Sequence, residues 1–486
     1  MELKKYQKNV INDLSRYLYF LNEIHNPAKA YSKLWEEKGI LTDGIVMPAY
    51  HTDIRGVPHV CIKVPTGGGK TYIAANAIKP IFDSMPPMRA KAVVWLVPSD
   101  SILTQTLNNL SDTNHPYRQR IDVDFMGNVE VYSKSQLLNG QNFNPITVAE
   151  QLSIFVLTYD SFRTNKKEGR KAYQQNGYLA PFSKMAKDSN VLLENTDETA
   201  LIQVIRSLNP IVIVDESHHA VSDLSVEMLN NFNPCFVLDL TATPKTNSNI
   251  ISFVDAIQLK KENMVKLPVI VYNRKSQNDV YTDAINIRRK LEIRAKKEQE
   301  KTGRYIRPIV LFQAQPRNNE DSTTYEKIKR ILIDCGISES HIAIKTADKD
   351  ELKNINLMSS NCHIRYIITV NALKEGWDCP FAYVLATVAN RSSIVDVEQI
   401  LGRVLRLPYT KKNPSDVLNL SYVITSSDNF NTTLEKVVEG LNNAGFSRND
   451  YRTGDSCETN IENIAADDSQ MSISLENNII DDVPDA

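Results

Sequence analysis

Short apolar runs alternate with segments of helical periodicity along most of the 486-residue chain. After an amphipathic opening at residues 3–18, five runs are largely apolar and lack a regular alternation of apolar and polar positions. Such runs are typical of strands that are buried on both faces, as in a parallel sheet. The five runs are residues 60–64, 93–97, 155–158, 211–214 and 236–240. Their alternation with helices predicts an α/β domain.

A second series of apolar runs follows a charged stretch near residues 258–267. The runs of this series are residues 268–271, 309–312, 342–344, 366–370, 382–388 and 422–425. The chain is also too long for one ordinary hydrophobic core. We therefore expect an α/β protein with two domains, each built on a mainly parallel sheet.

The expected domain limits are residues 1–262 and 263–426, followed by a helix and an acidic tail at 427–486. Residues 162–200 are polar and rich in Lys and Asn, and they interrupt the first domain as either an insertion near the substrate or a floppy surface loop. The acidic tail is disordered or the start of a longer segment. No internal repeat is recognisable in the sequence.

A charged helix is expected at residues 279–302, after the first apolar run of the second domain. Two basic clusters, at residues 288–290 and 296–297, lie on it. They suit a contact with nucleic acid, but a charged face exposed to solvent is the more common origin of such clusters.

Net charge is informative only when it is divided along the chain. The whole chain has a formal charge of −2, but residues 451–486 hold nine acidic residues and one arginine, which leaves +6 for residues 1–450. A mildly basic body is compatible with binding to a nucleic-acid backbone, although affinity depends on where the charges gather.

The cysteines and the hydropathy indicate a cytoplasmic protein. Six cysteines are scattered along the chain, with no CxxC pair and no signal peptide before them, so we interpret them as reduced thiols. No apolar run approaches the ~18 residues that a membrane-spanning helix needs. We expect no association with a membrane.

A glycine-rich segment follows the first expected strand. It comprises Thr66, Gly67, Gly68, Gly69, Lys70 and Thr71. Its backbone N–H groups can approach a triphosphate, Lys70 can reach the outer phosphates, and the Thr71 hydroxyl can hold Mg²⁺. Val64 stands where the general P-loop pattern has its first glycine, so a glycine turn without nucleotide is the alternative. The segment predicts a site for ATP and Mg²⁺.

Two carboxylates, Asp215 and Glu216, directly follow the apolar run at residues 211–214. Ligands bind at the carboxyl ends of strands in an open α/β sheet, so Asp215 can hold Mg²⁺ while Glu216 orients the attacking water. A solvated acidic loop is the alternative. The upstream Gly-Lys-Thr makes catalysis the better interpretation.

Arg403 and Arg406 lie three residues apart in a segment with helical apolar spacing, so both would project from one helical face. A planar, permanently charged guanidinium suits the stabilisation of charge on a transferring γ-phosphoryl group. An ordinary basic helix face is the alternative. Because these arginines lie far downstream, the second domain must supply them, which predicts an ATP site between the two domains.

The order of these motifs resembles that of superfamily 2 helicases, over roughly residues 5–425. Within that superfamily, the sequence Glu-Gly-Trp-Asp-Cys-Pro at residues 375–380, the strand after it and the segment 399–408 are most similar to the restriction (Res) subunit of type III restriction enzymes. The resemblance implies two RecA-like lobes and a DEAH-like motor that uses ATP and Mg²⁺.

The same resemblance implies roles for further residues near the nucleotide. Gln7 resembles the glutamine motif that reads adenine, although a glutamine near an N-terminus often lies simply on the surface. Gly376 and Asp378 would lie near the γ-phosphate and the joint between the lobes. Gln399 joins the two arginines as a catalytic candidate.

Three residues are implied to couple the nucleotide to the nucleic acid. Thr241 and Thr243 resemble motif III, whose hydroxyls link the two sites, and the same segment also suits a helix-capping turn. His218 would connect the state of the nucleotide to motif III. An incidental polar turn is the alternative for His218, because no other ligand has metal-like spacing around it.

These observations predict an ATP-dependent DNA translocase or helicase, with double-stranded DNA as the favoured partner, in a restriction or phage-defence system. No paired acidic-plus-lysine nuclease signature follows Arg406, so we expect no cleavage by this chain and a companion modification, specificity or nuclease subunit. Two alternatives need the same pocket. One is an RNA helicase, and the other is a nucleotide-switched clamp that binds nucleic acid without processive movement.

Overall fold

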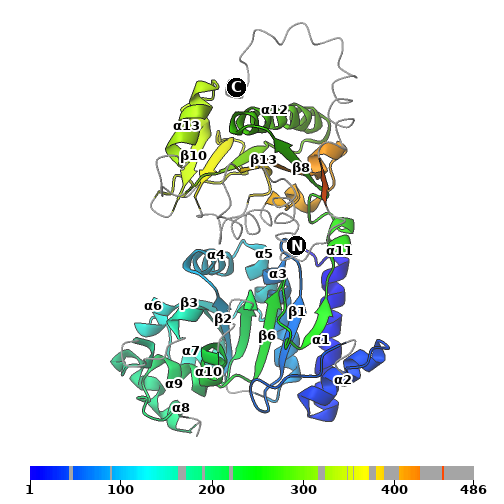
Figure 1. The fold of residues 1–486 in the computed structure, drawn as a ribbon. Helices are drawn as coiled ribbons and strands as arrows, with labels where there is room; N and C mark the ends of the chain where they lie inside the picture. Colours follow the sequence, from blue (N-terminus) through cyan, green and yellow to red (C-terminus); the bar gives the residue numbers. More distant parts are fainter. Residues whose placement is uncertain are drawn as a thin grey trace. The chain divides into compact units, whose positions relative to one another are not determined.

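The fold consists of two compact units, Met1–Val254 and Asp255–Ala486, in the computed structural model. Each unit contains one seven-stranded sheet with helices packed against it (Figure 1). The domain limits expected from the sequence remain a prediction. The residues that the structure describes are 1–42, 47–87, 90–162, 171–188, 192–217, 223–315, 323–346, 349–353, 355–370, 379–387, 404–426 and 451–453.

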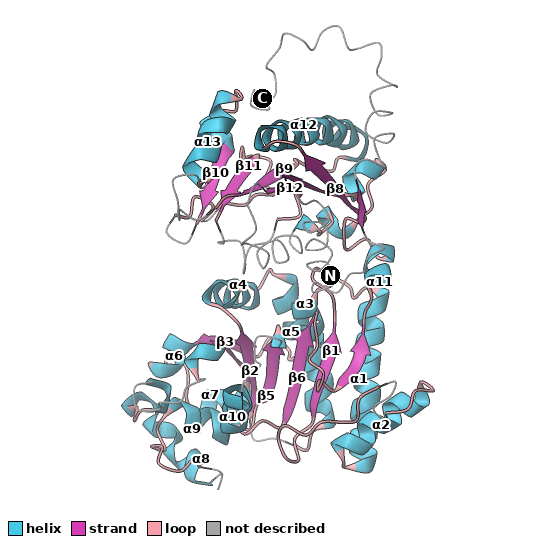
Figure 2. Ribbon diagram, viewed as in Figure 1, coloured by secondary structure: helices cyan, strands magenta, loops and turns pink. Residues whose placement is uncertain are grey.

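The first unit alternates strands and helices along the chain (Figure 2). Its α-helices are α1 (Lys5–Ile24), α2 (Pro27–Glu37), α3 (Lys70–Ser84), α4 (Asp100–Ser111), α5 (Pro116–Asp124), α6 (Lys134–Leu138), α7 (Pro145–Glu150), α8 (Ser183–Asp188), α9 (Leu201–Ser207) and α10 (Asp223–Phe232). Its strands are β1 (His59–Lys63), β2 (Lys91–Val97), β3 (Val129–Ser133), β4 (Leu152–Thr158), β5 (Ile211–Asp215), β6 (Phe236–Thr241) and β7 (Ile250–Phe253).

All neighbouring strands of the first sheet are parallel, in the order β3-β4-β2-β5-β6-β1-β7. The five strands expected from the sequence are present, and β5 lies in the centre with every residue buried. The two strands that the sequence did not indicate, β3 and β7, form the edges of the sheet. Edge strands need no continuous apolar run, because one side of each lacks a neighbouring strand.

The amphipathic opening of the chain forms α1. Its buried side chains recur at helical spacing and include Val10, Leu14, Tyr17 and Leu21. These residues face the rest of the unit, where α1 contacts α2, α3 and the edge strand β7. The helix therefore covers an edge of the sheet and brings its first turn next to the glycine-rich loop.

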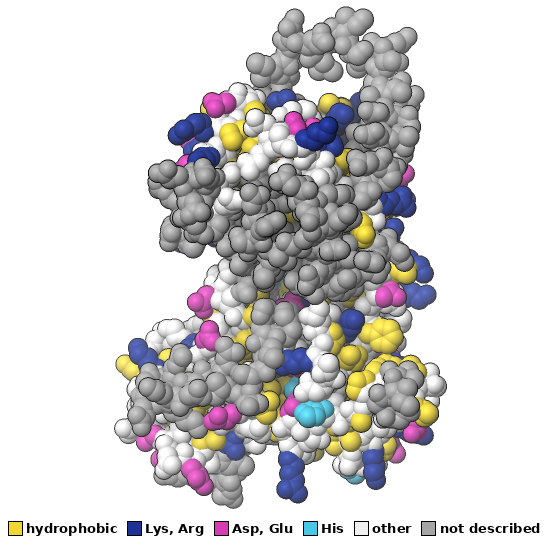
Figure 3. Space-filling model, viewed as in Figure 1, with side chains coloured by type: hydrophobic (Ala, Val, Ile, Leu, Met, Phe, Trp, Pro, Cys, Tyr) yellow, Lys and Arg dark blue, Asp and Glu magenta, His cyan; other side chains and the backbone are white. Residues whose placement is uncertain are grey.

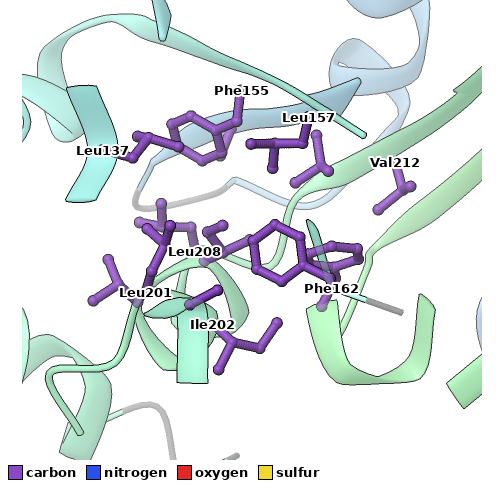
Figure 4. Close-up of a cluster of buried hydrophobic side chains, with 14 of the residues drawn as sticks. Leu137, Phe155, Leu157, Phe162, Leu201, Ile202, Leu208 and Val212 are labelled. Atoms are coloured by element: carbon purple, nitrogen blue, oxygen red, sulfur yellow. The ribbon is translucent and has the colours of Figure 1, made fainter. Parts of the chain in front are cut away.

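The polar interruption of the first domain is partly core. Ala172, Leu179 and Phe182 are fully buried, and they join one apolar cluster with Phe155 and Val212 from the sheet. Figure 4 shows how side chains of β4 and β5 meet those of α9 and its neighbours in this cluster. The alternative of a floppy surface loop is therefore wrong for the described residues 171–188.

The second unit has the same alternation of strands and helices. Its α-helices are α11 (Ala256–Lys261), α12 (Gln277–Thr302) and α13 (Tyr325–Asp334) among the described residues. Its strands are β8 (Val269–Arg274), β9 (Ile309–Gln313), β10 (Ile342–Lys345), β11 (Tyr366–Thr369), β12 (Ala382–Thr387), β13 (Ser421–Ser426) and β14 (Tyr451–Thr453). The six strands expected from the sequence are confirmed, and β14 is an addition.

The second sheet is also parallel throughout, in the order β10-β11-β9-β12-β13-β8-β14. When the strands of each unit are counted along the chain, both sheets have the order third, fourth, second, fifth, sixth, first, seventh. The predicted fold class, two α/β lobes with parallel sheets, is thus confirmed. Tyr451–Thr453, within the expected acidic tail, form the edge strand β14 of this sheet.

One of the basic clusters expected on the surface of α12 is partly buried. Arg288 is only 1% exposed, forms an ion pair with Glu292 one turn along the helix, and lies 5.1 Å above the ring of Tyr366. A nucleic-acid contact and a solvated charged face are both wrong for this side chain. Arg288 helps to pack α12 on the second sheet instead.

Candidate nucleotide site

The glycine-rich loop connects β1 to α3. Its backbone is held to the neighbouring strand, because the Val64 N–H donates a hydrogen bond of 2.9 Å to the Thr241 carbonyl. Gly67 and Gly69 have φ angles of 82° and 75°, which favour glycine, and α3 begins directly afterwards at Lys70. A helix of 15 residues thus presents its N-terminal N–H groups at the loop, which is an arrangement suited to phosphate.

The first turn of α1 holds this loop from the other side. The Tyr6 hydroxyl donates to the Gly68 carbonyl at 2.7 Å, and the Gln7 Nε2 donates to the same oxygen at 3.3 Å. The Gln7 Oε1 accepts from the Lys4 N–H at 2.9 Å, and the Gln7 side chain is fully buried. A Cβ atom on Gly69 would lie 2.7 Å from the Gln7 Nε2. The loop and the helix therefore fit each other closely.

The acidic pair lies at the carboxyl end of the central strand β5. Asp215 is 7% exposed, and its Oδ1 has no hydrogen-bond partner. Burial and the neighbouring charge of Glu216 raise the pKa of the Asp215 carboxyl to about 7, while Lys70 acts in the opposite direction. The hydroxyl of Tyr159, which follows β4, donates to the Asp215 carbonyl. A buried, unsatisfied carboxylate oxygen at this position suits a cation ligand.

Glu216 and Lys70 join the two motifs directly. Their Oε1 and Nζ atoms are 2.8 Å apart, and the Lys70 side chain is only 9% exposed. Glu216 has a φ angle of 52°, in the left-handed region that residues other than glycine rarely adopt. The backbone after β5 thus turns sharply and places the Glu216 carboxylate over the start of α3.

The two threonines that resemble motif III lie next to the glycine-rich loop, on β6 and the turn after it. Thr241 ends β6, is fully buried and pairs in register with Lys63 of β1. Its Oγ1 accepts from the Thr243 N–H at 3.2 Å, so the two threonines share one turn. A movement of this turn would act on the loop through the hydrogen bond between Val64 and Thr241.

The structure thus brings together the candidates of the first unit, at the carboxyl ends of β1, β5 and β6. They are Gln7, Thr66, Gly67, Gly68, Gly69, Lys70, Thr71, Asp215, Glu216, Thr241 and Thr243. Five candidates lie outside the described residues: His218, Gly376, Asp378, Gln399 and Arg403. Arg406 lies in the second unit, where its backbone pairs with Val265 in an antiparallel bridge. The roles of all of these residues remain predictions.

Sequence reasoning missed two contributors to this site. The hydrogen bond of Tyr6 to the loop depends on how α1 packs, which no local sequence pattern reveals. Tyr159 had a usable signal, because it directly follows the apolar strand β4 at the edge of the sheet where Asp215 emerges.

Charge and composition add little to the definition of the site. On the face that Figure 3 shows, basic and acidic side chains are interspersed over the described residues instead of forming one patch. Among the described residues, no group of three or more His, Cys, Asp or Glu could hold a metal ion. None of the described helices is long and apolar enough to cross a membrane.

Known proteins resemble this chain over most of its length. Putative helicase 22 of the Sulfolobus islandicus filamentous virus (isolate Iceland/Hveragerdi) is 20% identical in an alignment of 426 positions that covers 82% of this chain. The chain spans 65% of the length of that relative.

One solved structure is similar in fold, and a second is matched with a lower score. The ATP-dependent type ISP restriction-modification enzyme LlaBIII bound to DNA has a TM-score of 0.51 and 14% identity, over 91% of this chain and 30% of that one. A fragment of an HsdR subunit of a type I restriction enzyme from Vibrio vulnificus YJ016 has a TM-score of 0.45 and 15% identity, over 81% of this chain and 64% of that one.

The matched region of a family model coincides with the unit that carries the glycine-rich loop and the acidic pair. The model described as "Type III restriction enzyme, res subunit" matches residues 1–246, which are half of the chain. The two-lobed fold and the motifs agree with this match. The chain therefore belongs to the family of type III restriction enzyme res subunits, which are helicase-like ATPase motors.

Proposed function

We propose that this chain is an ATP-dependent DNA translocase or helicase that hydrolyses ATP between its two RecA-like lobes. One observation carries the proposal: the Lys70 ammonium, the buried Asp215 and the Glu216 carboxylate meet where β1 and β5 end. This is the edge of a parallel sheet where ligands bind. The match of this unit to a family of helicase-like motors supports the proposal.

The glycine-rich loop and the start of α3 would bind the triphosphate of ATP. The N–H groups at the start of α3 and the Lys70 ammonium would neutralise the phosphate oxygens. Tyr6 and Gln7 would keep the loop in the required shape through the Gly68 carbonyl. To read adenine as well, the Gln7 amide would have to give up its hydrogen bond with the Lys4 N–H or with the Gly68 carbonyl.

Thr71 and Asp215 would hold Mg²⁺, and the unsatisfied Oδ1 of Asp215 fits that role. When bound, Mg²⁺ supplies positive charge next to the β- and γ-phosphates. A cation would also favour the charged form of Asp215, whose pKa is raised to about 7 by burial and by Glu216.

Glu216 would orient the water that attacks the γ-phosphate. It contacts Lys70 at 2.8 Å, so binding of phosphate to Lys70 would compete with this ion pair and free the carboxylate for water. Arg403, Arg406, Gln399, Gly376 and Asp378 would complete the site from the second lobe. His218, Thr241 and Thr243 would report the state of the nucleotide to the nucleic-acid cleft.

Double-stranded DNA is the proposed partner, and a companion modification, specificity or nuclease subunit belongs to the same proposal. The family match and the likeness to a restriction-modification enzyme bound to DNA support a role in restriction or phage defence. An RNA helicase and a nucleotide-switched clamp use the same residues. They differ from a DNA motor in what stimulates turnover and in whether turnover produces movement.

Steady-state ATP hydrolysis of the purified chain tests the proposal. The comparison is between no nucleic acid, double-stranded DNA, single-stranded DNA and RNA, each with the wild type and with Lys70→Ala. A DNA motor requires stimulation by DNA that Lys70→Ala abolishes. Stimulation by RNA alone would favour an RNA helicase, and turnover that is unchanged by all three nucleic acids would contradict the proposal for this chain.

Displacement of a triplex-forming strand separates the motor from the clamp. A translocating motor removes the third strand in the presence of ATP, whereas a clamp hydrolyses ATP and leaves the triplex intact. The Glu216→Gln variant is the control, because it keeps the binding residues and lacks the carboxylate that orients water.

A further inference from the structure

A buried lysine lies in the second unit, on the segment between α11 and β8. Lys266 is fully buried, and its Nζ donates to the Pro380 carbonyl at 2.8 Å and to the Ala382 carbonyl at 2.6 Å. The Nζ also lies 4.0 Å from the centroid of the Tyr383 ring. An ammonium group loses much hydration free energy on burial, so it is retained where hydrogen bonds and a ring fix it in one place.

The backbone of the same segment is paired with the residues around Arg406. The Lys266 N–H donates to the Leu405 carbonyl at 2.5 Å, and the Leu407 N–H donates to the Met264 carbonyl at 3.0 Å. Val265 and Arg406 form the antiparallel bridge between these two hydrogen bonds. The position of the Arg406 backbone is therefore set by the segment that Lys266 anchors.

A serine of the second sheet contacts both paired segments. The Ser421 hydroxyl, at the start of β13, is fully buried and lies 3.2 Å from the Lys266 carbonyl and 3.4 Å from the Val404 carbonyl. Three stretches are thus tied together: the residues after the boundary between the units, the start of β12, and the residues that contain Arg406.

We propose that Lys266 is a positioning residue for Arg406: its buried ammonium anchors the segment 264–267 to the start of β12, and this segment holds the backbone of Arg406 in place. The inference rests on the proposed role of Arg406 in ATP hydrolysis. Pro380 also follows closely on Gly376 and Asp378 in the chain, so the same ammonium is bound to the residues that come directly after these two candidates. Lys266 needs no contact with the nucleotide to act in this way.

Lys266→Met tests the proposal in the full chain. Methionine retains the length and the apolar stem of the side chain and removes the three N–H donors. We expect kcat of DNA-stimulated hydrolysis to fall by about 10- to 100-fold, because a misplacement of about 1 Å near the chemistry has effects of this size. The KM for ATP and the Kd for DNA should stay within about twofold, since the residues of the first unit are unchanged.

Arg288→Met is the matched control. Arg288 is an equally buried cation of the same unit that also lies over a tyrosine ring, and its contacts with Glu292 and Tyr366 pack α12 on the second sheet. It should lower the melting temperature and leave kcat within about twofold at a temperature where the protein is folded. An equal loss of kcat in both variants would overturn the proposal, because general destabilisation would then explain it.

A double-mutant cycle with Arg406→Ala supplies a readout that a merely structural role would not change. If Lys266 acts through Arg406, the Lys266→Met/Arg406→Ala variant should be no slower than Arg406→Ala alone. Hydrogen exchange should also become faster at the amides of Lys266 and Leu407. Additive losses in the cycle, or a wild-type kcat for Lys266→Met, would overturn the proposal.

Two further measurements keep the outcomes distinct. Should Lys266→Met fail to fold, Ser421→Ala removes the hydroxyl that joins the Lys266 and Val404 carbonyls. This variant should lower kcat by up to about fivefold, as expected for one hydrogen bond. A kcat equal to that of the wild type would then count against the proposal. Failure of the proposed function would give a different result. In that case, nucleic acid would not stimulate ATP turnover by the wild type above the level of Lys70→Ala.

Discussion

The two sheets of this protein have the same strand order, but their strands bury different types of polar side chain. Among the Asp, Glu, His, Lys and Arg side chains on the described strands of the first sheet, three are buried, and they are His59, Asp215 and Asp239. In the second sheet, the polar residues buried on the described strands are neutral, and they are Gln313, Thr369, Thr387, Ser421 and Thr425. One topology therefore carries a charged sheet and a neutral sheet.

This difference shows which property of the fold assigns function. The strand order places the carboxyl ends of the strands at one edge, and this holds for both units. The residues at those ends then decide the chemistry. A glycine-rich loop follows β1, and β5 ends in Asp215 with Glu216 directly after it. The corresponding strands of the second sheet, β8 and β12, end in Arg274 and Thr387.

The largest expected effect on ATP turnover comes from comparing substitutions at the carboxyl end of the fifth strand in each sheet, β5 and β12. Glu216→Gln, after β5, should lower stimulated kcat by about 10²- to 10⁴-fold and retain ATP binding, because an amide cannot act as a base toward the attacking water. Thr387→Val, at the end of β12, should change unstimulated turnover by less than about twofold. The measurements are turnover and the binding of a fluorescent ATP analogue. Similar losses in both variants would mean that the two ends do not differ in function.

The next effect concerns the loop after the first strand of each sheet. Lys70→Ala should lower kcat/KM for ATP by about 10²- to 10³-fold, as expected when one fixed charge is removed from a phosphate site. Lys275 follows β8 at the corresponding place and is exposed. Lys275→Ala should leave unstimulated turnover unchanged. A loss with Lys275→Ala as large as that with Lys70→Ala would contradict the assignment of the nucleotide to the first unit.

Burial of Asp215 in the first sheet should make the free energy of unfolding depend on pH. Burial and the charge of Glu216 raise the pKa of Asp215 to about 7. The folded protein therefore keeps a proton that the unfolded chain loses near pH 4, and the free energy of unfolding decreases as pH rises from about 4 to about 7. Between pH 5 and pH 8, the wild type should lose on the order of 1–3 kcal/mol relative to Asp215→Asn. Urea unfolding in the presence of EDTA measures this, and parallel pH profiles would disprove it.

The smallest expected effect is on stability, and it comes from substituting two glycines that have similar φ angles. Gly69 in the nucleotide loop has a φ angle of 75° and Gly303 at the end of α12 has one of 70°. Gly303→Ala should cost about 1 kcal/mol of stability, because nothing lies within 4 Å of the added Cβ and only the backbone is strained. Gly69→Ala should cost more and weaken ATP binding, since its Cβ would meet the Gln7 Nε2.

Adding Gln7→Ala tests this cause. The second substitution should recover part of the stability that Gly69→Ala loses, as measured by thermal unfolding. Equal costs for the two glycine variants would show that the loop adjusts to the extra methyl group without resistance.

The sequence predicted the central strands and the nucleotide motifs because both are local patterns. The apolar run of β5 and the glycines before Lys70 are complete within a few residues. By contrast, β3, β7 and β14 are edge strands whose existence depends on a neighbour from elsewhere in the chain. The repeated strand order was also invisible, since the residues that line the two sheets differ.

Other features depended on contacts between distant residues. Arg288 looks like part of a basic surface until Tyr366, far along the chain, is seen beneath it. The same holds for Lys266, which resembles any polar residue of a connecting segment and is buried against Pro380 and Ala382. A sequence shows that such a cation exists, and only the fold shows whether water reaches it.

The contact between the start of the chain and the nucleotide loop has a practical consequence for handling this protein. The Tyr72 hydroxyl donates to the Met1 carbonyl at 2.5 Å, and Tyr6 and Gln7 hold the Gly68 carbonyl. An affinity tag or fluorescent fusion joined before Met1 would therefore lie next to the glycine-rich loop of the candidate nucleotide site. Any apparent loss of activity in an N-terminally tagged sample should therefore be checked again after the tag has been cleaved.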